Sequence, residues 1–324
     1  MSALSRRAFP EQGRDPAAAI GRLAVEALRL ELETYPKPGL VSLVDSGSHA
    51  DMDAATFRAS AAALEPWFAA LARAGAAGEP MPALRRLGIA AEADMRAATG
   101  GVNTHRGAIF GLGLLCAAAG SEAAGRSPVL ATIRQPDPEP TPRPEAAPQH
   151  LGMGAGGRAA SAVQPSRSEI GRFGALIRAR YAEAILDGPE LLHAPGARAR
   201  RRHRVGGAPA EAAAGFPTLY RVGLPALRRG RRLRPGDPEA ARVEACLALI
   251  AELEDTNLLH RGGAEGYAFA RAEAARFIAE GGIGQTDWRA RAEALHGGFV
   301  ARNLSPGGAA DLLAMTLFVD AAEA

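Results

Sequence analysis

Four short segments of the sequence combine glycines with side chains that bind anions or metal ions or that move protons. The segments are residues 35–53, 99–110, 254–263 and 302–314. Glycines let a backbone approach a ligand closely, while Asp, Asn, His, Lys and Arg supply carboxylates, amides, imidazoles and cations. Each segment adjoins a predicted helix end. This pattern suits a ligand that carries several phosphates, bridged by a metal ion and held by backbone amides and cations.

The segment at residues 99–110 places four different polar groups within one turn. Asn103, Thr104, His105 and Arg106 supply an amide, a hydroxyl, an imidazole and a guanidinium. The ordinary interpretation is that Gly100 ends one helix and that Asn103 or Thr104 caps the next. A binding role is favoured here because three other segments have the same character.

Lys37 is the only lysine in the chain and lies between two prolines. The prolines exclude a helix at residues 35–39, so the chain there is predicted to be extended and to present Lys37. Among so many arginines, a retained lysine indicates a compact charge that reaches a phosphate, whereas chance retention is the alternative. Gly39 follows within the same stretch.

A histidine and two carboxylates follow closely, at His49, Asp51 and Asp53. Asp53 precedes a predicted helix, and its ordinary role is that of the N-cap, whereas Asp51 has no such role. Carboxylates beside a histidine suit Mg²⁺ binding or general-base catalysis better than they suit zinc.

The fourth segment predicts a helix start at Ser305, with an anion site at the free N–H groups around Gly307 and Gly308. Asp311 follows about one turn later, where a pure phosphate site would not place a negative charge. A phosphate that arrives with Mg²⁺ would explain this carboxylate. Asp255 is the corresponding carboxylate of the third segment.

The elements that position these segments are predicted to be helices. The 324-residue chain is rich in Ala, Leu and Arg and poor in β-branched and aromatic residues, which favours helix over strand. We therefore expect an all-α protein with a single multi-helix domain at residues 15–324, whose helix-end loops form one site. The predicted helices cover residues 15–34, 54–74, 83–98, 169–186, 237–253, 264–280 and 287–300, with another that ends near residue 119.

Two regions are predicted to lie outside this helical core. Residues 1–14 are expected to be a disordered leader. Residues 125–168 are rich in proline without an apolar period, which predicts a disordered insertion that interrupts the domain without dividing it.

Composition excludes several classes of protein. The net charge is only +3, and the arginine clusters at residues 198–204 and 228–234 lack the interleaved aromatics of a nucleic-acid surface, so we predict no nucleic-acid partner. Cys116 and Cys246 lie in apolar helical stretches and are predicted to be small core residues. No signal peptide or bilayer-length apolar run is present, so a cytoplasmic location without a membrane partner is expected.

The motifs together resemble those of the triphosphoribosyl-dephospho-CoA synthase family. The resemblance rests on residues 35–41, 47–53, 99–110, 255–257 and 303–314, which match in order over most of the chain outside the leader and the insertion. Residues 206–217 and 258–263 resemble the malonate decarboxylase branch of the family more than the citrate lyase branch.

The resemblance implies an enzyme that transfers the 5-triphosphoribosyl group of ATP to the 2′-hydroxyl of 3′-dephospho-CoA and releases adenine. The product is the precursor of the prosthetic group of the malonate decarboxylase acyl carrier protein, and a second transferase would load it onto that carrier. Alternatives are a Mg²⁺-dependent N-ribosyl hydrolase and a non-catalytic nucleotide-binding assembly factor. The sequence does not fix the oligomeric state, and a homodimer is kept as an option.

Under this resemblance, the transition state would be oxocarbenium-like, and the site must hold the triphosphate, deprotonate the acceptor hydroxyl and assist the leaving adenine. The predicted catalytic residues are Asp255, Asp311 and Asp51. The predicted substrate- and phosphate-binding residues are Lys37, Gly39, His49, Asn103, His105, Arg106, Asn257, Ser305, Gly307 and Gly308. The predicted Mg²⁺ ligands are Asp51, Asp53, Asp255 and Asp311, and the spacing does not decide which aspartate is the general base. Reserve carboxylates are Glu92 and Glu211.

Two positions depart from the family pattern. Arg106 stands where the family pattern has lysine, which keeps the charge but changes the donor geometry. Ala208, Pro209 and Ala210 stand where an arginine is expected before Glu211. The missing arginine puts the role of this segment in doubt and predicts weakened activity.

Overall fold

The computed structural model describes residues 15–126, 170–189 and 193–323, and these contain helices but no strand. The all-α prediction is therefore confirmed for the described residues. The leader at 1–14 and nearly all of the insertion at 125–168 lie outside them. The elements are α1 (Pro16–Leu32), α2 (Ala54–Ala77), α3 (Met81–Ala98), α4 (Arg106–Ala123), α6 (Gly171–Leu186), α7 (Pro195–His203), α8 (Gly207–Ala213), the π-helical turn η2 (Leu219–Gly223), α9 (Leu224–Leu233), α10 (Pro238–Glu252), α11 (Thr256–Ala279), the 3₁₀ turn η3 (Gly282–Gly284), α12 (Trp288–Ala301) and α13 (Gly307–Ala322).

Several helices begin at the caps that the sequence predicts. The Asp15 and Asp237 side chains accept hydrogen bonds from the first-turn backbone of α1 and α10, each followed by a proline. Asp53 forms a capping box with Thr56 at the start of α2. These aspartates satisfy N–H groups that the helix itself leaves without partners.

Residues 254–263 are predicted to be a loop, but most of them are helical in the structure. Asp255 caps a helix that begins at Thr256, so the predicted start of this helix at residue 264 is about two turns late. Gly263, with φ of 61°, interrupts the helical dihedral angles within α11. The polar residues of this segment therefore lie on the first turns of a helix, at fixed positions relative to one another.

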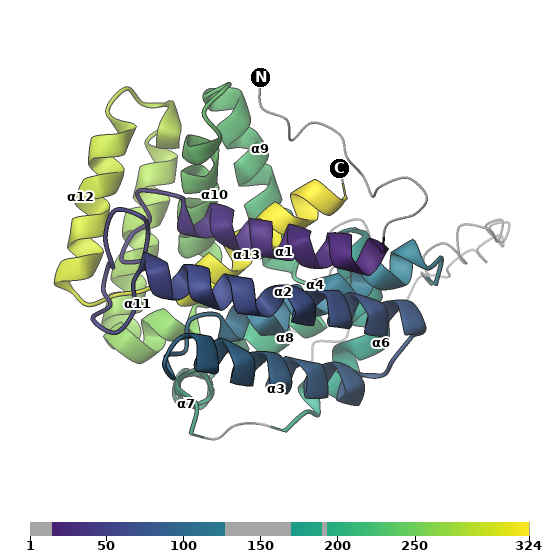
Figure 1. The fold of residues 1–324 in the computed structure, drawn as a ribbon. Coiled ribbons are helices and arrows are strands. Elements are labelled where there is room, and N and C mark those ends of the chain that lie inside the picture. The colour runs from purple at the N-terminus through teal and green to yellow at the C-terminus, as the bar shows by residue number, and fades with distance from the viewer. Residues whose placement is uncertain (1–14, 127–169, 190–192, 324) are drawn as a thin grey trace, which may run out of the picture.

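In the N-terminal half of the protein, α2 packs against α1, α3 and α4. Figure 1 shows α1, α2 and α3 lying side by side, with the yellow α13 crossing behind α1. α13 packs on both α1 and α4, and α10 packs on α9 and α11. α13 thus joins the N-terminal helices to the C-terminal ones, and its first residues lie where both groups meet.

Two composition-based predictions can be compared with the structure. Cys116 and Cys246 are free thiols with 0% exposure, which confirms that they are core residues. Each helix in the described ranges is too short or too polar to cross a membrane.

α2 and α4 approach each other closely through two glycines. A Cβ atom added at Gly75 would lie 1.9 Å from the carbonyl oxygen of Ala117, and one at Gly120 would lie 2.0 Å from that of Ala72. Backbone atoms cannot move aside as a flexible side chain can. Any larger residue at these positions must therefore push the two helices apart.

We predict that Gly75→Ala lowers the free energy of unfolding by about 1–3 kcal/mol, the usual cost of overpacking. Gly88→Ala is the matched control, because Gly88 lies within α3 and an added Cβ there meets no atom within 4 Å. The control should stabilise the protein by about 0.5–1 kcal/mol, through the intrinsic helix preference for alanine. Urea unfolding of both variants tests this, and equal stabilisation by both would contradict the close approach.

Candidate functional site

The four polar segments meet around residues 303–311. A Cβ atom added at Gly39 would lie 2.0 Å from the carbonyl oxygen of Leu304, and one added at Gly107 would lie 1.9 Å from Oδ2 of Asp311. The first and second segments therefore pack directly against the fourth, at positions that only glycine fits. The third segment joins them through Asp255.

The buried Asp255 carboxylate binds the N-termini of two helices. Its Oδ1 accepts hydrogen bonds from the N–H groups of Asn257 (2.8 Å) and Leu258 (3.2 Å) in α11. Its Oδ2 accepts from the N–H of Ala309 (3.0 Å) in α13, and the Gly308 N–H also bonds to it. Burial raises the pKa of Asp255, and these backbone donors oppose the rise. The predicted anion site at the start of α13 thus already holds an anion, which is the protein's own carboxylate.

Asp311 is a partly buried carboxyl group that lies against the first turn of α4. Besides its contact with Gly107, it accepts a backbone hydrogen bond from Ala108. Burial raises its pKa well above the ordinary value, and the negative charges of Asp255 and Glu31 raise it further. We call Glu31, Asp255 and Asp311 the carboxyl cluster. Of the two aspartates in this cluster, Asp311 has the pKa that is raised further.

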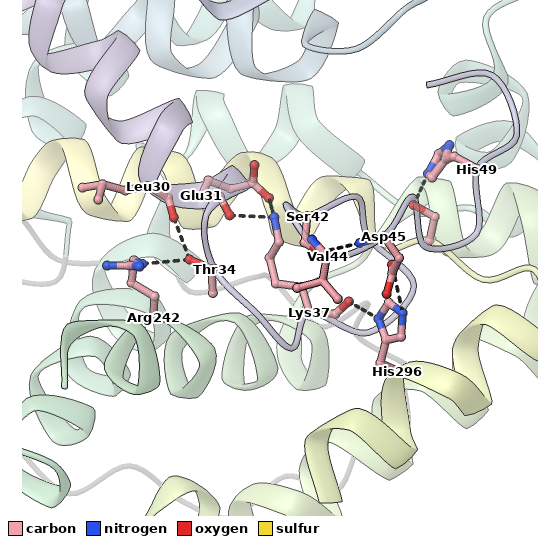
Figure 2. Close-up of polar contacts among 11 residues, drawn as sticks. Leu30, Glu31, Thr34, Lys37, Ser42, Val44, Asp45, His49, Arg242 and His296 are labelled. Carbon is pink, nitrogen blue, oxygen red and sulfur yellow. Dashed lines mark hydrogen bonds and ion pairs between the residues drawn. The ribbon is translucent and has the colours of Figure 1, made fainter. Parts of the chain in front are cut away.

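Lys37 is enclosed in the protein, with 0% exposure. Figure 2 shows its side chain turned back toward the last turn of α1, where its Nζ donates to the carbonyl oxygen (2.6 Å) and to Oε1 (2.5 Å) of Glu31. The ammonium therefore balances a buried carboxylate and the negative end of a helix. In this arrangement Lys37 is not presented to solvent as the proline-flanked sequence predicts, and its phosphate-binding role stays a prediction.

The loop that carries Lys37 is fastened to α12 by His296. The ring Nδ1 of His296 donates to the carbonyl oxygen of Lys37 (2.8 Å), while its Nε2 lies 3.3 Å from Oδ1 of Asp45. Both contacts are visible in Figure 2. On the other side, Arg242 donates to the Thr34 hydroxyl (2.8 Å). The extended segment is thus held in place by contacts to two different helices.

His105 is a buried histidine at the N-cap of α4. Its Nδ1 lies 2.6 Å from the Ser60 hydroxyl, which accepts a hydrogen bond from Thr104 (2.7 Å). Phe57 packs edge-on against the ring. Burial, with help from the Lys37 charge, lowers the pKa of His105 to about 3, so the imidazole is neutral. Among the described residues, its Nε2 is the one buried side-chain nitrogen or oxygen without a hydrogen-bond partner.

Five polar residues from three segments form what we call the arginine clamp. Arg261 donates to Nε2 of His49 (3.2 Å), to the carbonyl oxygen of Ser48 (2.5 Å) and to Oδ1 of Asn303 (2.7 Å). The Ser305 hydroxyl lies 2.9 Å from the same His49 nitrogen. The predicted site residues His49 and Ser305 are therefore in direct contact, and Arg261 connects them to α11.

The other predicted residues lie around this centre. Asp51 is exposed, with Oδ1 3.8 Å from Nδ1 of His49, and Asp53 is exposed in its capping box. Arg106 pairs with Glu92 (3.4 Å), and Asn103 is exposed. The structure shows Asp53 in the N-cap role that the sequence suggests. Among the described residues, no hydrogen bond or ion pair joins Asp53 to the carboxyl cluster.

Two further predicted features lie on the third segment and beyond it. Asn257 lies so close to Gly307 that a Cβ atom there would be 2.5 Å from its Nδ2. Glu211 in α8 accepts hydrogen bonds from the N–H (2.7 Å) and hydroxyl (3.0 Å) of Thr218. Burial raises the pKa of Glu211, which Glu254 raises further. Glu211 thus has its own partners and is not part of the carboxyl cluster.

The described residues do not form a metal site by themselves. No group of three His, Cys, Asp or Glu side chains in that part of the chain is arranged to hold an ion. Both oxygens of Asp255 already accept backbone hydrogen bonds, whereas Asp311 has oxygen lone pairs to spare. The residues therefore fit a Mg²⁺ ion that is carried by a polyphosphate and needs only one or two carboxylates, and not an ion held by protein ligands alone.

The sequence analysis missed Glu31 and Arg261. Glu31 interrupts the apolar stripe of α1, three residues after Leu28, and a carboxylate on a buried face is a detectable signal of a buried charge partner. Arg261 follows Asn257 by four residues, which places both on one face of α11. That signal was hidden because the segment was predicted to be a loop.

Comparison with known proteins gives a consistent result. A family model described as ATP:dephospho-CoA triphosphoribosyl transferase matches residues 17–324. A Stutzerimonas stutzeri (strain A1501) protein named "Probable 2-(5''-triphosphoribosyl)-3'-dephosphocoenzyme-A synthase" is 40% identical, covering 99% of this chain and 96% of its own. Proteins of the same name from Azotobacter vinelandii (strain DJ) and Albidiferax ferrireducens are 39% and 38% identical and cover 93% and 94% of this chain and 90% and 91% of their own. No solved structure matches the chain.

We predict that Asp311→Asn changes how stability depends on pH. The raised pKa of Asp311 means that, above the ordinary carboxyl pKa of about 3.9, the folded state keeps a proton that the unfolded chain releases. The free energy of unfolding that this group contributes therefore falls as pH rises toward the raised pKa. The variant lacks this term, so its stability relative to the wild type should increase as pH rises from the ordinary carboxyl pKa toward the raised pKa of Asp311. Urea unfolding across this range tests the sign, and a constant difference would contradict it.

Proposed function

We propose, because this chain belongs to the ATP:dephospho-CoA triphosphoribosyl transferase family, that it moves the 5-triphosphoribosyl group of ATP to the 2′-hydroxyl of 3′-dephospho-CoA. The bond between adenine and ribose C1′ breaks, and a bond between C1′ and the acceptor oxygen forms. The proton of the hydroxyl leaves with adenine, and the triphosphate stays on the sugar. The observation that supports this most is the meeting of all four motif segments around residues 303–311.

Asp311 is the residue that we assign as general base for the acceptor hydroxyl. It is partly exposed and can therefore be reached by a substrate, and its raised pKa brings it closer to the range in which a base works at neutral pH. Asp255 cannot do the same work without giving up two helix caps. We therefore divide the two aspartates, with Asp311 moving the proton and Asp255 fixing the frame.

The residues that flank Asp311 would orient the sugar and base. Asn257 lies beside Gly307 at the start of α13, and its side-chain amide both donates and accepts hydrogen bonds. His105 is neutral and follows the exposed Asn103 by two positions. A neutral imidazole suits contact with a sugar hydroxyl or adenine nitrogen better than it suits neutralising a phosphate.

Mg²⁺ would enter with the triphosphate, and Asp311 or the exposed Asp51 would complete its oxygen ligands. When bound, the ion would neutralise phosphate charge and hold the polyphosphate in one conformation. The protein's own part is to place Asp51 beside His49 of the clamp, which carries the guanidinium of Arg261. This assignment needs no preformed metal site.

We further propose that the product serves malonate decarboxylase rather than citrate lyase, through a second transferase that loads its acyl carrier protein. The support is the sequence of residues 206–217 and 258–263, which resembles the malonate decarboxylase branch. Residues 258–263 are the part of α11 that includes Arg261, so this branch resemblance falls within the site.

We predict that adenine is released from ATP only when Mg²⁺ and 3′-dephospho-CoA are both present. The acceptor should gain the mass of one triphosphoribosyl group, which mass spectrometry of the product measures. Release without acceptor would favour the N-ribosyl hydrolase. Binding of ATP without release would favour the assembly factor.

Asp311→Asn should reduce adenine release by about 100-fold or more, the usual contribution of a general base. Asp320→Asn is the matched control on the same helix, because Asp320 pairs with Arg231 far along α13. Loss of that partly exposed pair should leave turnover unchanged. Near-normal turnover of the Asp311→Asn variant, with the fold intact by circular dichroism, would remove the base role.

A further inference from the structure

Arg261 is fixed in position by three hydrogen bonds from two loops. Its acceptors are the Ser48 carbonyl, the Asn303 side-chain oxygen and the His49 ring, so both terminal nitrogens are held. It lies one turn after Asn257 on α11, about 6 Å along the helix axis. The guanidinium is therefore held at a fixed position between α11 and the loops that carry Ser48 and Asn303.

The acceptors that hold this cation carry no negative charge. Among the described residues, no carboxylate oxygen forms an ion pair with Arg261, in contrast to Arg229 with Glu244 or Arg231 with Asp320. Partial burial lowers the pKa of Arg261, and the exposed Asp51 opposes this from a distance. A partly desolvated charge without a counter-charge costs free energy that an anionic ligand can offset.

His49 is a neutral partner of Arg261: it carries no negative charge that would pair with the guanidinium, and no positive charge that would also attract an anion. A guanidinium only donates, so the His49 Nε2 that it contacts must accept, and the imidazole is then neutral with its proton on Nδ1. Burial and the nearby Arg261 charge both lower the pKa of His49, in agreement. The clamp thus presents one net positive charge with neutral hydrogen-bonding groups around it.

Lys37, the other cation near the centre, is already neutralised. Its two observed hydrogen bonds both go to Glu31, and it has no exposed surface. Arg261 has five N–H groups, of which three are used within the clamp, so two are left for a ligand. The two cations therefore differ in what they can still bind.

We propose that Arg261 binds the polyphosphate chain of the nucleotide substrate, and that Lys37 is an internal counter-ion. This inference rests on the proposed function for the identity of the nucleotide, but the chemistry it requires is a di- or triphosphate. Arg261 holds the phosphates at the clamp while the sugar lies toward Asn257 and Asp311. The guanidinium stays bound to its three protein acceptors and uses its remaining N–H groups for phosphate oxygens.

The test is calorimetric binding of inorganic tripolyphosphate to the full chain, which needs no turnover. Arg261→Gln should weaken binding by about tenfold or more, the loss expected for a charge-assisted contact. Asn303→Asp should weaken it similarly, because it keeps the Oδ1 acceptor and adds a negative charge beside the guanidinium. Asn303 has φ of 53°, which aspartate also tolerates.

Arg302→Gln is the matched control for general surface charge. Arg302 is exposed and contacts the Phe269 ring and the Gly298 carbonyl, so it lies next to the clamp without belonging to it. Its loss should change binding by no more than about twofold, as for an exposed charge. In the same proteins, Asn303→Asp should raise the KM for ATP more than it lowers kcat.

Three results would overturn the proposal. One is a wild-type chain that does not bind tripolyphosphate. Another is unchanged binding by Asn303→Asp, which would make Arg261 a structural clamp even if Arg261→Gln fails to fold. The third is an equal loss in Arg302→Gln. Failure of the proposed function looks different, because tripolyphosphate binding would still depend on Arg261 while adenine release from ATP was absent.

Discussion

The structure depends on one carboxylate that binds two helix ends at once. Asp255 accepts hydrogen bonds from the first turns of α11 and α13, two helices that are about 50 residues apart in the chain. The N-termini of helices repel one another because each carries partial positive charge, and a shared anion allows them to meet. The meeting of α11 and α13 brings Asn257 against Gly307 at the start of α13 and Arg261 against Asn303 just before it.

This arrangement leaves the charges of the site unevenly balanced. Asp255 is compensated by backbone N–H groups and Glu31 by Lys37, so Asp311 is the member of the carboxyl cluster without a matching cation in the described part of the chain. Within the same residues, Arg261 is the corresponding cation without a matching carboxylate. Both are held by neutral partners instead of pairing with each other. A cation without a counter-charge, and apart from it a carboxyl group with a raised pKa, suit a substrate that brings an anionic chain at one end and a proton to be removed at the other.

Sequence reasoning predicted the elements of the fold better than the contacts of the site. Asp-Pro pairs and apolar periodicity locate α1 and α10 because caps and amphipathic faces are local properties. The chemistry of Lys37 could not be predicted, because prolines indicate an extended backbone but not the direction in which the side chain turns. Arg261 was missed because the start of α11 depends on Asp255, whose second set of donors comes from α13. The partners of a charged group are set by packing between distant segments.

The dual role of Asp255 also determines which residue can report on catalysis. Removing its side chain would take away the caps of two helices, each worth about 1 kcal/mol, and would leave several buried N–H groups without acceptors. A loss of activity in such a variant would therefore follow equally from a displaced α13, which carries Asp311, and from a missing catalytic group. Asp311 has one backbone donor and a raised pKa, so the folded state gains little from its ionised form. Its substitution separates chemistry from folding, which a substitution of Asp255 cannot do.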